Sequence, residues 1–350
     1  MKRLNHLVAC TALSLSALCL GPLYALASEQ ITINGSSTVY PYARAVAEVL
    51  AGQGKTIATP KVTSTGTGAG IEQFCSDNAK GPDIVNASRR MRTAELETCN
   101  RNGHEVVEFK IGYDAIVLAK NKQSEPLHLS RRDIYLALAS KVLDDSGSNF
   151  YTTSPYFNWQ DVNPALPAIP IQVFGPPLTS GTRDTFAEMV MLPGCVEQPY
   201  FKNLQQNKSR NLNTLCQAVR RDMTFIDLPE EEQTILGQMQ SSKDIVGIMN
   251  YRIYQANTDA LQALAIEGVL PEFANIESGA YPLTRPLYFY VKKERIQANP
   301  EITSYLAEFT SDSATGPNGY AVKLGLVPAN AGERAASIKT SRELPLLKLP

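Results

Sequence analysis

The sequence predicts an α/β fold, because short β-type segments alternate with helical segments along the chain. Each of the first three units combines a strand, a turn rich in Gly, Ser or Thr, and a helix. The strands are expected at 31–33, 61–65 and 83–85, and the helices that follow them at 43–51, 71–75 and 93–99. Such units favour a mostly parallel sheet with helices on both faces. The 350 residues, 43% of them hydrophobic, are enough for two domains with substantial cores.

The rest of the chain continues this alternation less regularly. Strands are expected at 106–109, 115–119, 169–174, 245–249 and 287–291, and helices at 131–140, 183–191, 213–221, 230–240 and 300–310. Ser130 is placed to cap the helix that follows it. Residues 192–212 are expected to form a polar loop.

Residues 1–27 have the three parts of a secretory signal peptide. Lys2 and Arg3 precede a short apolar core, and Ala25-Leu26-Ala27 is an A-x-A cleavage site. Two alternatives remain: a lipoprotein box ending at Cys10, and a buried N-terminal helix. We expect an exported, soluble mature chain that starts at Ser28.

Four of the six cysteines remain after residue 27: Cys75, Cys99, Cys195 and Cys216. An even number in an oxidising compartment predicts two disulfides, and three pairings exist. The short-range pairing, Cys75–Cys99 and Cys195–Cys216, is favoured because roughly twenty residues separate each pair. A metal site is the alternative, but the chain has no CxxC spacing and no histidine close to these cysteines.

Charge and histidine content exclude several classes of protein. The full chain has 33 basic and 34 acidic residues, and the chain from residue 28 has 31 and 34, a net charge of −3. Binding to nucleic acid through a basic surface is therefore not expected. With only three histidines, at positions 6, 104 and 128, a multi-histidine metal centre is not expected either.

The informative feature of the chain is its strand-to-helix turns. Four of them are rich in glycine, serine or threonine, and two also carry an arginine: Gly35–Thr38, Gly66–Gly68, Ala87–Arg89 and Ser180–Arg183. Glycine allows close backbone approach, and a helix start offers unpaired N–H groups and the positive end of the helix dipole. Together the four turns predict a site for a small anion at the carboxyl edge of the sheet.

Each turn also has a simpler explanation as a helix cap, and the two arginines as surface residues. The turn at 66–70 does not fit a Walker A loop or GxGxxG. Asp114 is either a carboxylate of the site or a structural residue at a strand end. Catalysis is weakly indicated, because Ser180 lacks a GxSxG context and no base is evident.

These turns resemble those of the PstS family, the periplasmic phosphate receptors of ABC-type importers. Five segments carry the resemblance in the expected order: Asn34–Pro41, Gly66–Gly70, Asp83–Arg89, Phe174–Asp184 and Tyr281–Leu287. The Ser-Gly-Thr-Arg-Asp turn followed by Tyr-Pro-Leu-Thr-Arg-Pro is the most specific part of the pattern.

The resemblance implies a two-lobed periplasmic binding protein fold of type II-like topology. Each lobe would be a mixed sheet flanked by helices, and the chain would cross between lobes near Ala119–Lys122 and Ser278–Pro286. Lobe 1 would combine residues 28–119 and 287–350, and lobe 2 would be residues 120–286. Closure would be a hinge motion around a ligand in the cleft.

The resemblance also implies a phosphate site. Its expected residues are Ser37, Thr38, the Val39 amide, Thr67, Gly68, Ser88, Arg89, Ser180, Gly181 and Thr182, with Arg183 and Asp114 as secondary candidates. One position departs from the family pattern, because Arg89 stands where many members have an aspartate that accepts the proton of hydrogen phosphate. Rejection of sulfate would then depend on Asp114, Asp184 or a hydroxyl acceptor.

The expected function is capture of inorganic phosphate in the periplasm and delivery to a membrane ABC permease, by a monomer without cofactor, metal or enzymatic activity. Three alternatives remain open: a secreted phosphatase or other hydrolase using the same cleft, a receptor for another oxyanion such as sulfate or arsenate, and a surface interaction or adhesion protein.

Overall fold

The computed structural model describes residues 30–56, 58–78, 81–143, 151–178, 180–207, 211–228 and 232–349. The segment expected to be a signal peptide, residues 1–27, lies outside the described residues.

The described chain contains short strands and mostly short helices. The strands are β1 (Thr32–Gly35), β2 (Lys61–Val62), β3 (Ile84–Ala87), β4 (Val106–Asn121), β5 (His128–Leu129), β6 (Lys141–Leu143), β7 (Tyr151–Thr153), β8 (Val173–Gly175), β9 (Phe225–Asp227), β10 (Val246–Asn250), β11 (Leu261–Ala263), β12 (Ala265–Ile266) and β13 (Thr284–Lys292). The helices are α1 (Tyr40–Gly52), α2 (Thr67–Phe74), α3 (Thr93–Arg101), α4 (Arg131–Leu138), α5 (Trp159–Val162), α6 (Gly181–Phe186), the π-helical turn η1 (Ala187–Met191), α7 (Leu192–Val196), α8 (Pro199–Gln206), α9 (Leu212–Gln217), α10 (Glu232–Ser241), α11 (Tyr251–Ala256), α12 (Phe273–Glu277), α13 (Lys293–Ala298), α14 (Glu301–Phe309), α15 (Asp312–Thr315), α16 (Tyr320–Lys323) and α17 (Ala331–Glu343).

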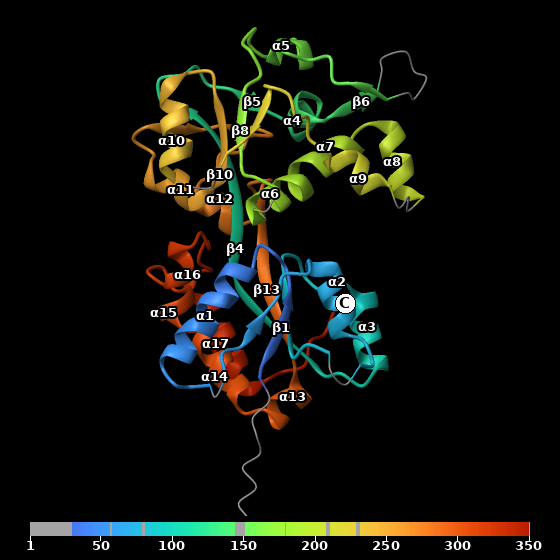
Figure 1. Ribbon diagram of the computed structural model, residues 1–350, viewed down its shortest axis with the longest axis vertical. Coiled ribbons are helices and arrows are strands. Elements are labelled where there is room, and N and C mark those ends of the chain that lie inside the picture. The colour runs from blue at the N-terminus through green and yellow to red at the C-terminus, as the bar shows by residue number, and fades with distance from the viewer. Residues whose placement is uncertain are drawn as a thin grey trace, which may run out of the picture.

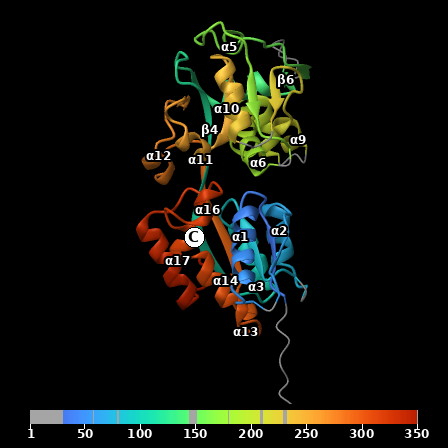
Figure 2. The same cartoon turned by 60° about the vertical axis from the view of Figure 1, so that its left-hand side comes forward.

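These elements form two bodies joined by two strands, β4 and β13 (Figure 1). Lobe 1 contains β1–β3, β13, the first part of β4, α1–α3 and α13–α17, and lobe 2 contains the remaining elements. In the rotated view, α10–α12 lie in lobe 2, whereas α13, α14, α16 and α17 lie in lobe 1 (Figure 2). The expected two-lobed α/β architecture is confirmed.

One hydrogen-bonded path of strands runs through both lobes, in the order β2-β1-β3-β13-β4-β10-β8-β9. The strands β2, β1 and β3 are parallel to one another, as the strand–turn–helix units predict, and β13 is antiparallel to both β3 and β4. Strand β4 pairs with β13 up to Ala115 and with β10 from Ile116 onward. The predicted lobe boundaries near Ala119–Lys122 and Ser278–Pro286 stay predictions.

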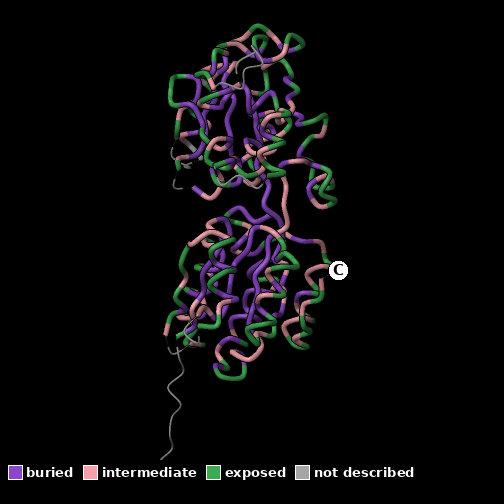
Figure 3. The backbone as a smooth tube through the Cα atoms, turned by 90° about the vertical axis from the view of Figure 1, so that its right-hand side faces the viewer, coloured by how far each residue is buried: buried purple, intermediate pink, exposed green. Residues whose placement is uncertain are grey.

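Each lobe buries apolar side chains on both faces of its part of the sheet, and the buried residues gather in the interior of each lobe (Figure 3). In lobe 1, one face packs against α1 and α14 around Phe289, whose ring stacks on Phe109 and Phe309. The other face packs against α2 and α3. In lobe 2 the larger core surrounds Trp159 and Tyr135, both fully buried.

Several predicted elements differ from the structure. The strands expected at 106–109 and 115–119 are one continuous strand of 16 residues, β4. The polar loop expected at 192–212 is wrong, because α7 and α8 occupy most of it and bury Cys195 and Phe201 against α4 and the rest of the lobe 2 core. Ser130 caps α4 as predicted, and its hydroxyl accepts a hydrogen bond from the Asp133 amide.

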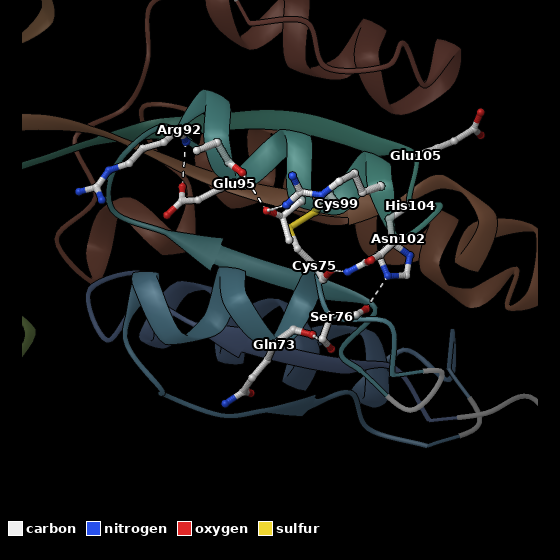
Figure 4. The surroundings of a disulfide bond; sticks show 12 residues. Gln73, Cys75, Ser76, Arg92, Glu95, Cys99, Asn102, His104 and Glu105 are labelled. Carbon is white, nitrogen blue, oxygen red and sulfur yellow. Dashed lines mark hydrogen bonds between the residues drawn. A yellow bond between two sulfur atoms is a disulfide. The ribbon is translucent and has the colours of Figure 1, made fainter.

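Both favoured disulfides are present, Cys75–Cys99 and Cys195–Cys216. The first joins the end of α2 to α3 (Figure 4). Beside it the Asn102 amide group donates to the Cys75 carbonyl, and His104 contacts the Ser76 carbonyl and Glu294. The second joins α7 to α9 inside lobe 2.

Within the described ranges, no helix has both the length and the apolar character needed to cross a membrane.

Replacing either cysteine pair by alanine should lower the free energy of unfolding by about 3 kcal/mol, because loops of 24 and 21 residues would lose their covalent constraint. Chemical denaturation of the oxidised protein, followed by circular dichroism, measures this loss. A reducing agent should destabilise the wild type and leave a variant that lacks all four cysteines unchanged. Equal stability of the wild type and both pair variants would contradict a stabilising role.

Candidate functional site

The turn before α1 presents backbone N–H groups at the carboxyl end of β1. The Ser36 amide donates to the Asn86 carbonyl (2.9 Å), and the Ser36 hydroxyl accepts from the Val39 amide (3.4 Å), which fixes the turn. The amides of Ser37 and Thr38 make no hydrogen bond to another described residue. They therefore stay available as donors at a helix start.

The turn before α6 belongs to lobe 2 and reaches the same place. The Ser180 hydroxyl caps this helix by accepting from the amides of Thr182 (3.0 Å) and Arg183 (3.3 Å). Gly181 packs against the α1 turn so closely that a Cβ atom there would lie 3.2 Å from Thr38 Cα. Two helix starts, one from each lobe, thus come into close contact because Gly181 has no side chain.

A cavity of about 250 Å³ lies at this meeting point. It is lined by Ser37, Thr38, Tyr40, Pro41, Tyr42, Asp114, Ser180, Gly181, Thr182, Asn250 and Leu324. Residues of both lobes contribute, and Asp114 is the charged residue among them. The lining is thus rich in hydroxyl groups and contains one carboxylate acceptor.

A buried arginine lies directly behind this lining. The Arg285 guanidinium donates to the hydroxyls of Thr38 (2.9 Å) and Thr185 (2.7 Å). Its Nε lies 3.4 Å from Asp114 Oδ2, and its Nη1 pairs with Glu188. The side chains of Arg285 and Asp114 are only 11% and 8% exposed, so solvent screens this ion pair weakly.

Contacts around the cavity connect the two lobes. The Thr185 hydroxyl donates to Asp114 (2.7 Å), and the Ser37 hydroxyl of lobe 1 donates to Asp184 of α6 (2.5 Å). Together with the Arg285 contacts, they place the start of α6 against the α1 turn. The site is thus formed only when both lobes come together.

The cavity brings together six of the twelve predicted site residues: Ser37, Thr38, Asp114, Ser180, Gly181 and Thr182. The other six do not line it: Val39, Thr67, Gly68, Ser88, Arg89 and Arg183. Val39 is fully buried. Thr67 and Ser88 share a hydrogen bond between their hydroxyls (3.0 Å). Contact of these six with a ligand stays a prediction.

The two predicted arginines are bound to other groups. Arg89 forms two hydrogen bonds to Glu95 of α3 (2.7 and 2.9 Å). Burial alone would raise the pKa of Glu95, but bonds from Arg89 and the Arg92 amide lower it. Arg183 pairs with Asp227 (2.8 Å) and stacks over Phe225.

Sequence reasoning missed Arg285 as a residue of the site. It belongs to the Tyr281–Leu287 segment, which helps to carry the resemblance, but Arg285 is not among the expected site residues. An arginine at the start of a strand that passes between two lobes is the signal that would have indicated it. The walls formed by Tyr40, Tyr42, Asn250 and Leu324 carry no such signal, because they come from ordinary helical and loop contexts.

Within the described residues, no group of three or more His, Cys, Asp or Glu side chains is arranged to hold a metal ion. Among the described residues, those that line the cavity include no His, Cys or Lys, so they offer hydroxyls without an adjacent nitrogen base. This arrangement can bind an oxyanion through many donors, with one carboxylate available to accept a proton.

Residues 24–313 match the PBP superfamily domain. Among curated proteins, the chain is 29% identical to protein SphX of Synechocystis sp. over 306 residues, which cover 86% of this chain and 79% of SphX. It is 27% identical to the phosphate-binding protein PstS of Staphylococcus saprophyticus over 278 residues, which cover 78% and 73% of the two chains.

Solved structures show the same fold. A possible phosphate-binding protein from Planctomyces limnophilus gives a TM-score of 0.72 at 24% identity, over 90% of this chain and 98% of that one. An ABC-type phosphate transport receptor from Vibrio cholerae gives a TM-score of 0.57 at 19% identity, over 85% of this chain and 99% of that one. The chain belongs to the PBP superfamily, and its resemblance to the PstS family of phosphate receptors is confirmed.

Proposed function

We propose that this protein captures inorganic phosphate between its lobes and delivers it to the permease of an ABC importer, without chemical change. The observation that carries the proposal is the cavity where the α1 and α6 turns meet, with free backbone donors, hydroxyls and a buried arginine behind them. The similarity to proteins named PstS supports phosphate as the ligand. Export to the periplasm and a monomeric state are part of the proposal.

The donors suit a tetrahedral oxyanion. The amides of Ser37, Thr38 and Gly181 make no hydrogen bond within the described residues, and each lies at a helix start. Thr38 and Thr182 also line the cavity, one from each lobe, and contribute hydroxyl groups. Bonds from N–H and O–H groups to an anion are charge-assisted and therefore stronger than neutral ones. Arg285 adds positive charge through Thr38 without lining the cavity.

Asp114 provides the basis for selectivity. A carboxylate at the wall of an anion site repels a fully ionised ligand but accepts a hydrogen bond from a protonated one. Hydrogen phosphate carries such a proton at neutral pH, and sulfate does not. Asp114 would take over the role of the aspartate for which this chain has Arg89. Arg285 and the Thr185 hydroxyl hold Asp114 at this wall.

Hinge motion would open and close the site. The two strands β4 and β13 run between the lobes, while the direct contacts Ser37–Asp184 and Arg285–Thr185 lie beside the cavity. Bending of the strands would separate the α6 turn from the α1 turn and expose the ligand. A permease that binds the two lobes in their separated state would promote release.

Calorimetry on residues 28–350 tests the proposal directly. Phosphate should bind with a dissociation constant at or below the micromolar range, and p-nitrophenyl phosphate should not be hydrolysed. Absence of phosphate binding at these concentrations would refute the proposal, and turnover of the ester would favour a hydrolase.

Arg285→Met should weaken phosphate binding by about tenfold or more, because the Thr38 hydroxyl loses the charged donor that orients it and the site loses its nearby positive charge, and hydrogen bonds to charged groups are worth about 1.5–3 kcal/mol. Arg89→Met is the matched control, since Arg89 pairs with Glu95 and does not line the cavity. Calorimetry on both variants should show that Arg89→Met lowers the phosphate affinity much less than Arg285→Met does. The reverse order would identify Arg89 as the main cation of the site.

Asp114→Asn should reduce the preference for phosphate over sulfate by about tenfold or more, a change of about 1.4 kcal/mol. The amide no longer repels the second charge of sulfate and offers it N–H donors. Glu188→Gln is the control, because Glu188 also pairs with Arg285 but lies outside the lining. Competition titrations measure both ratios, and an unchanged ratio in Asp114→Asn would exclude it as the discriminating acceptor.

A further inference from the structure

A second cavity, of about 430 Å³, lies in lobe 2 beside the end of β4. Its lining includes Lys120, Glu125, Pro167, Ile169 and Asp244, and it shares no residue with the phosphate cavity. Lys120 is six residues beyond Asp114 on the same strand, about 20 Å at the usual rise of a β-strand. The volume is in the range of small-molecule sites.

The feature that distinguishes this cavity is the amine of Lys120. The residue is 1% exposed, yet its side-chain amine makes no hydrogen bond and no ion pair within 4 Å to any described residue. An ammonium group has three donors, and leaving them unsatisfied in a buried place is costly. Burial lowers the pKa of Lys120, and Asp244 and Glu125 oppose this at longer range. Solvent still reaches the amine from the cavity, so its acceptors come from what occupies the cavity, either water or a bound ligand.

The walls around the amine are held in place. The loop after β4 is fixed by Gln262, which donates to the carbonyls of Asn121 (3.1 Å) and Ser124 (2.5 Å). The Ser124 hydroxyl in turn donates to the Lys243 carbonyl (2.5 Å), so the loops that carry Glu125 and Asp244 are tied together. A site with fixed walls loses little entropy when a ligand binds.

The charges of the lining indicate what kind of ligand fits. Two basic side chains, Lys120 and Lys243, and two acidic ones, Glu125 and Asp244, line the cavity and balance one another. A simple anion would satisfy Lys120 but would lie close to the two carboxylates. A molecule with both a carboxylate and an ammonium group can pair with the basic and the acidic side chains of the lining. Pro167 and Ile169 add an apolar wall against which its carbon chain can pack.

We propose that this cavity is a second binding site, for a small zwitterion of the amino-acid class. The ligand's carboxylate accepts hydrogen bonds from Lys120, its ammonium group faces Asp244 and Glu125, and its carbon chain contacts Pro167 and Ile169. The site is independent of the phosphate cavity, and binding there does not require that phosphate be the ligand of the cleft.

Three probes with the same number of carbon atoms show whether binding needs the carboxylate, the ammonium group or both: norvaline, pentanoate and pentylamine. Each is added in the millimolar range to residues 28–350 saturated with phosphate, and binding is followed by calorimetry and by the thermal unfolding midpoint. Norvaline should bind and raise the midpoint. Pentanoate and pentylamine should bind at least about tenfold more weakly.

Lys120→Met should abolish norvaline binding, whereas Lys122→Met should not, because the Lys122 amine is bonded to the Thr258 carbonyl outside the cavity. Asp244→Asn is a second variant in case Lys120→Met does not fold, and it should weaken norvaline much more than pentanoate. Phosphate affinity should be the same in all three variants.

Three outcomes would overturn the proposal. Absence of binding by all three probes would mean that the cavity holds water only. Equal binding of pentanoate and norvaline would show that the ammonium group is not recognised. Norvaline binding that survives both Lys120→Met and Asp244→Asn would place the probe elsewhere on the protein.

Discussion

The burial of Arg285 is the constraint on which the arrangement of the cleft depends. A guanidinium that is nearly inaccessible to water must be surrounded by acceptors, because an unpaired buried charge is very unfavourable. Here the acceptors come from both lobes: Thr38 from lobe 1, Thr185 and Glu188 from lobe 2, and Asp114 from the strand between them. The same contacts that pair the two terminal nitrogens of the arginine therefore bring the two helix starts together and shape the anion site.

This arrangement also explains how an acidic protein can hold an anion. The full chain has a net charge of −1, and the carboxylates of Asp114, Asp184 and Glu188 all lie at the site. Attraction therefore cannot depend on a positive surface. It depends on aligned backbone N–H groups and hydroxyls, whose dipoles act over short distances in a place partly shielded from water. The site therefore recognises an anion by its shape and by whether it carries a proton. This favours selectivity between anions over attraction of an anion from a distance.

Local patterns predicted local structure well, and contacts between distant segments poorly. The strand–turn–helix units, the cap at Ser130 and both disulfides follow from short stretches of sequence. Hydroxyl turns predicted five of the eleven residues of the cavity lining, because glycine, serine and threonine at helix starts have a local cause. The arginine of the cleft was missed, since Arg285 meets Thr38 across 247 positions. The helices at 192–206 were missed because they are short and their stability comes from packing around a disulfide.

The continuity of β4 has a consequence for how the chain folds. Lobe 1 needs strands from both ends of the sequence, because β13 pairs with β3 and with the first part of β4. Lobe 2 uses mainly the middle of the chain, and its sheet is built on the second part of β4. In chain order all strands of lobe 2 precede β13, because β12 ends at Ile266 and β13 begins at Thr284. Lobe 2 can therefore form its sheet before the sheet of lobe 1 is complete. Once β13 is in place, one strand is shared by both sheets, and loss of β4 would unfold the two lobes together.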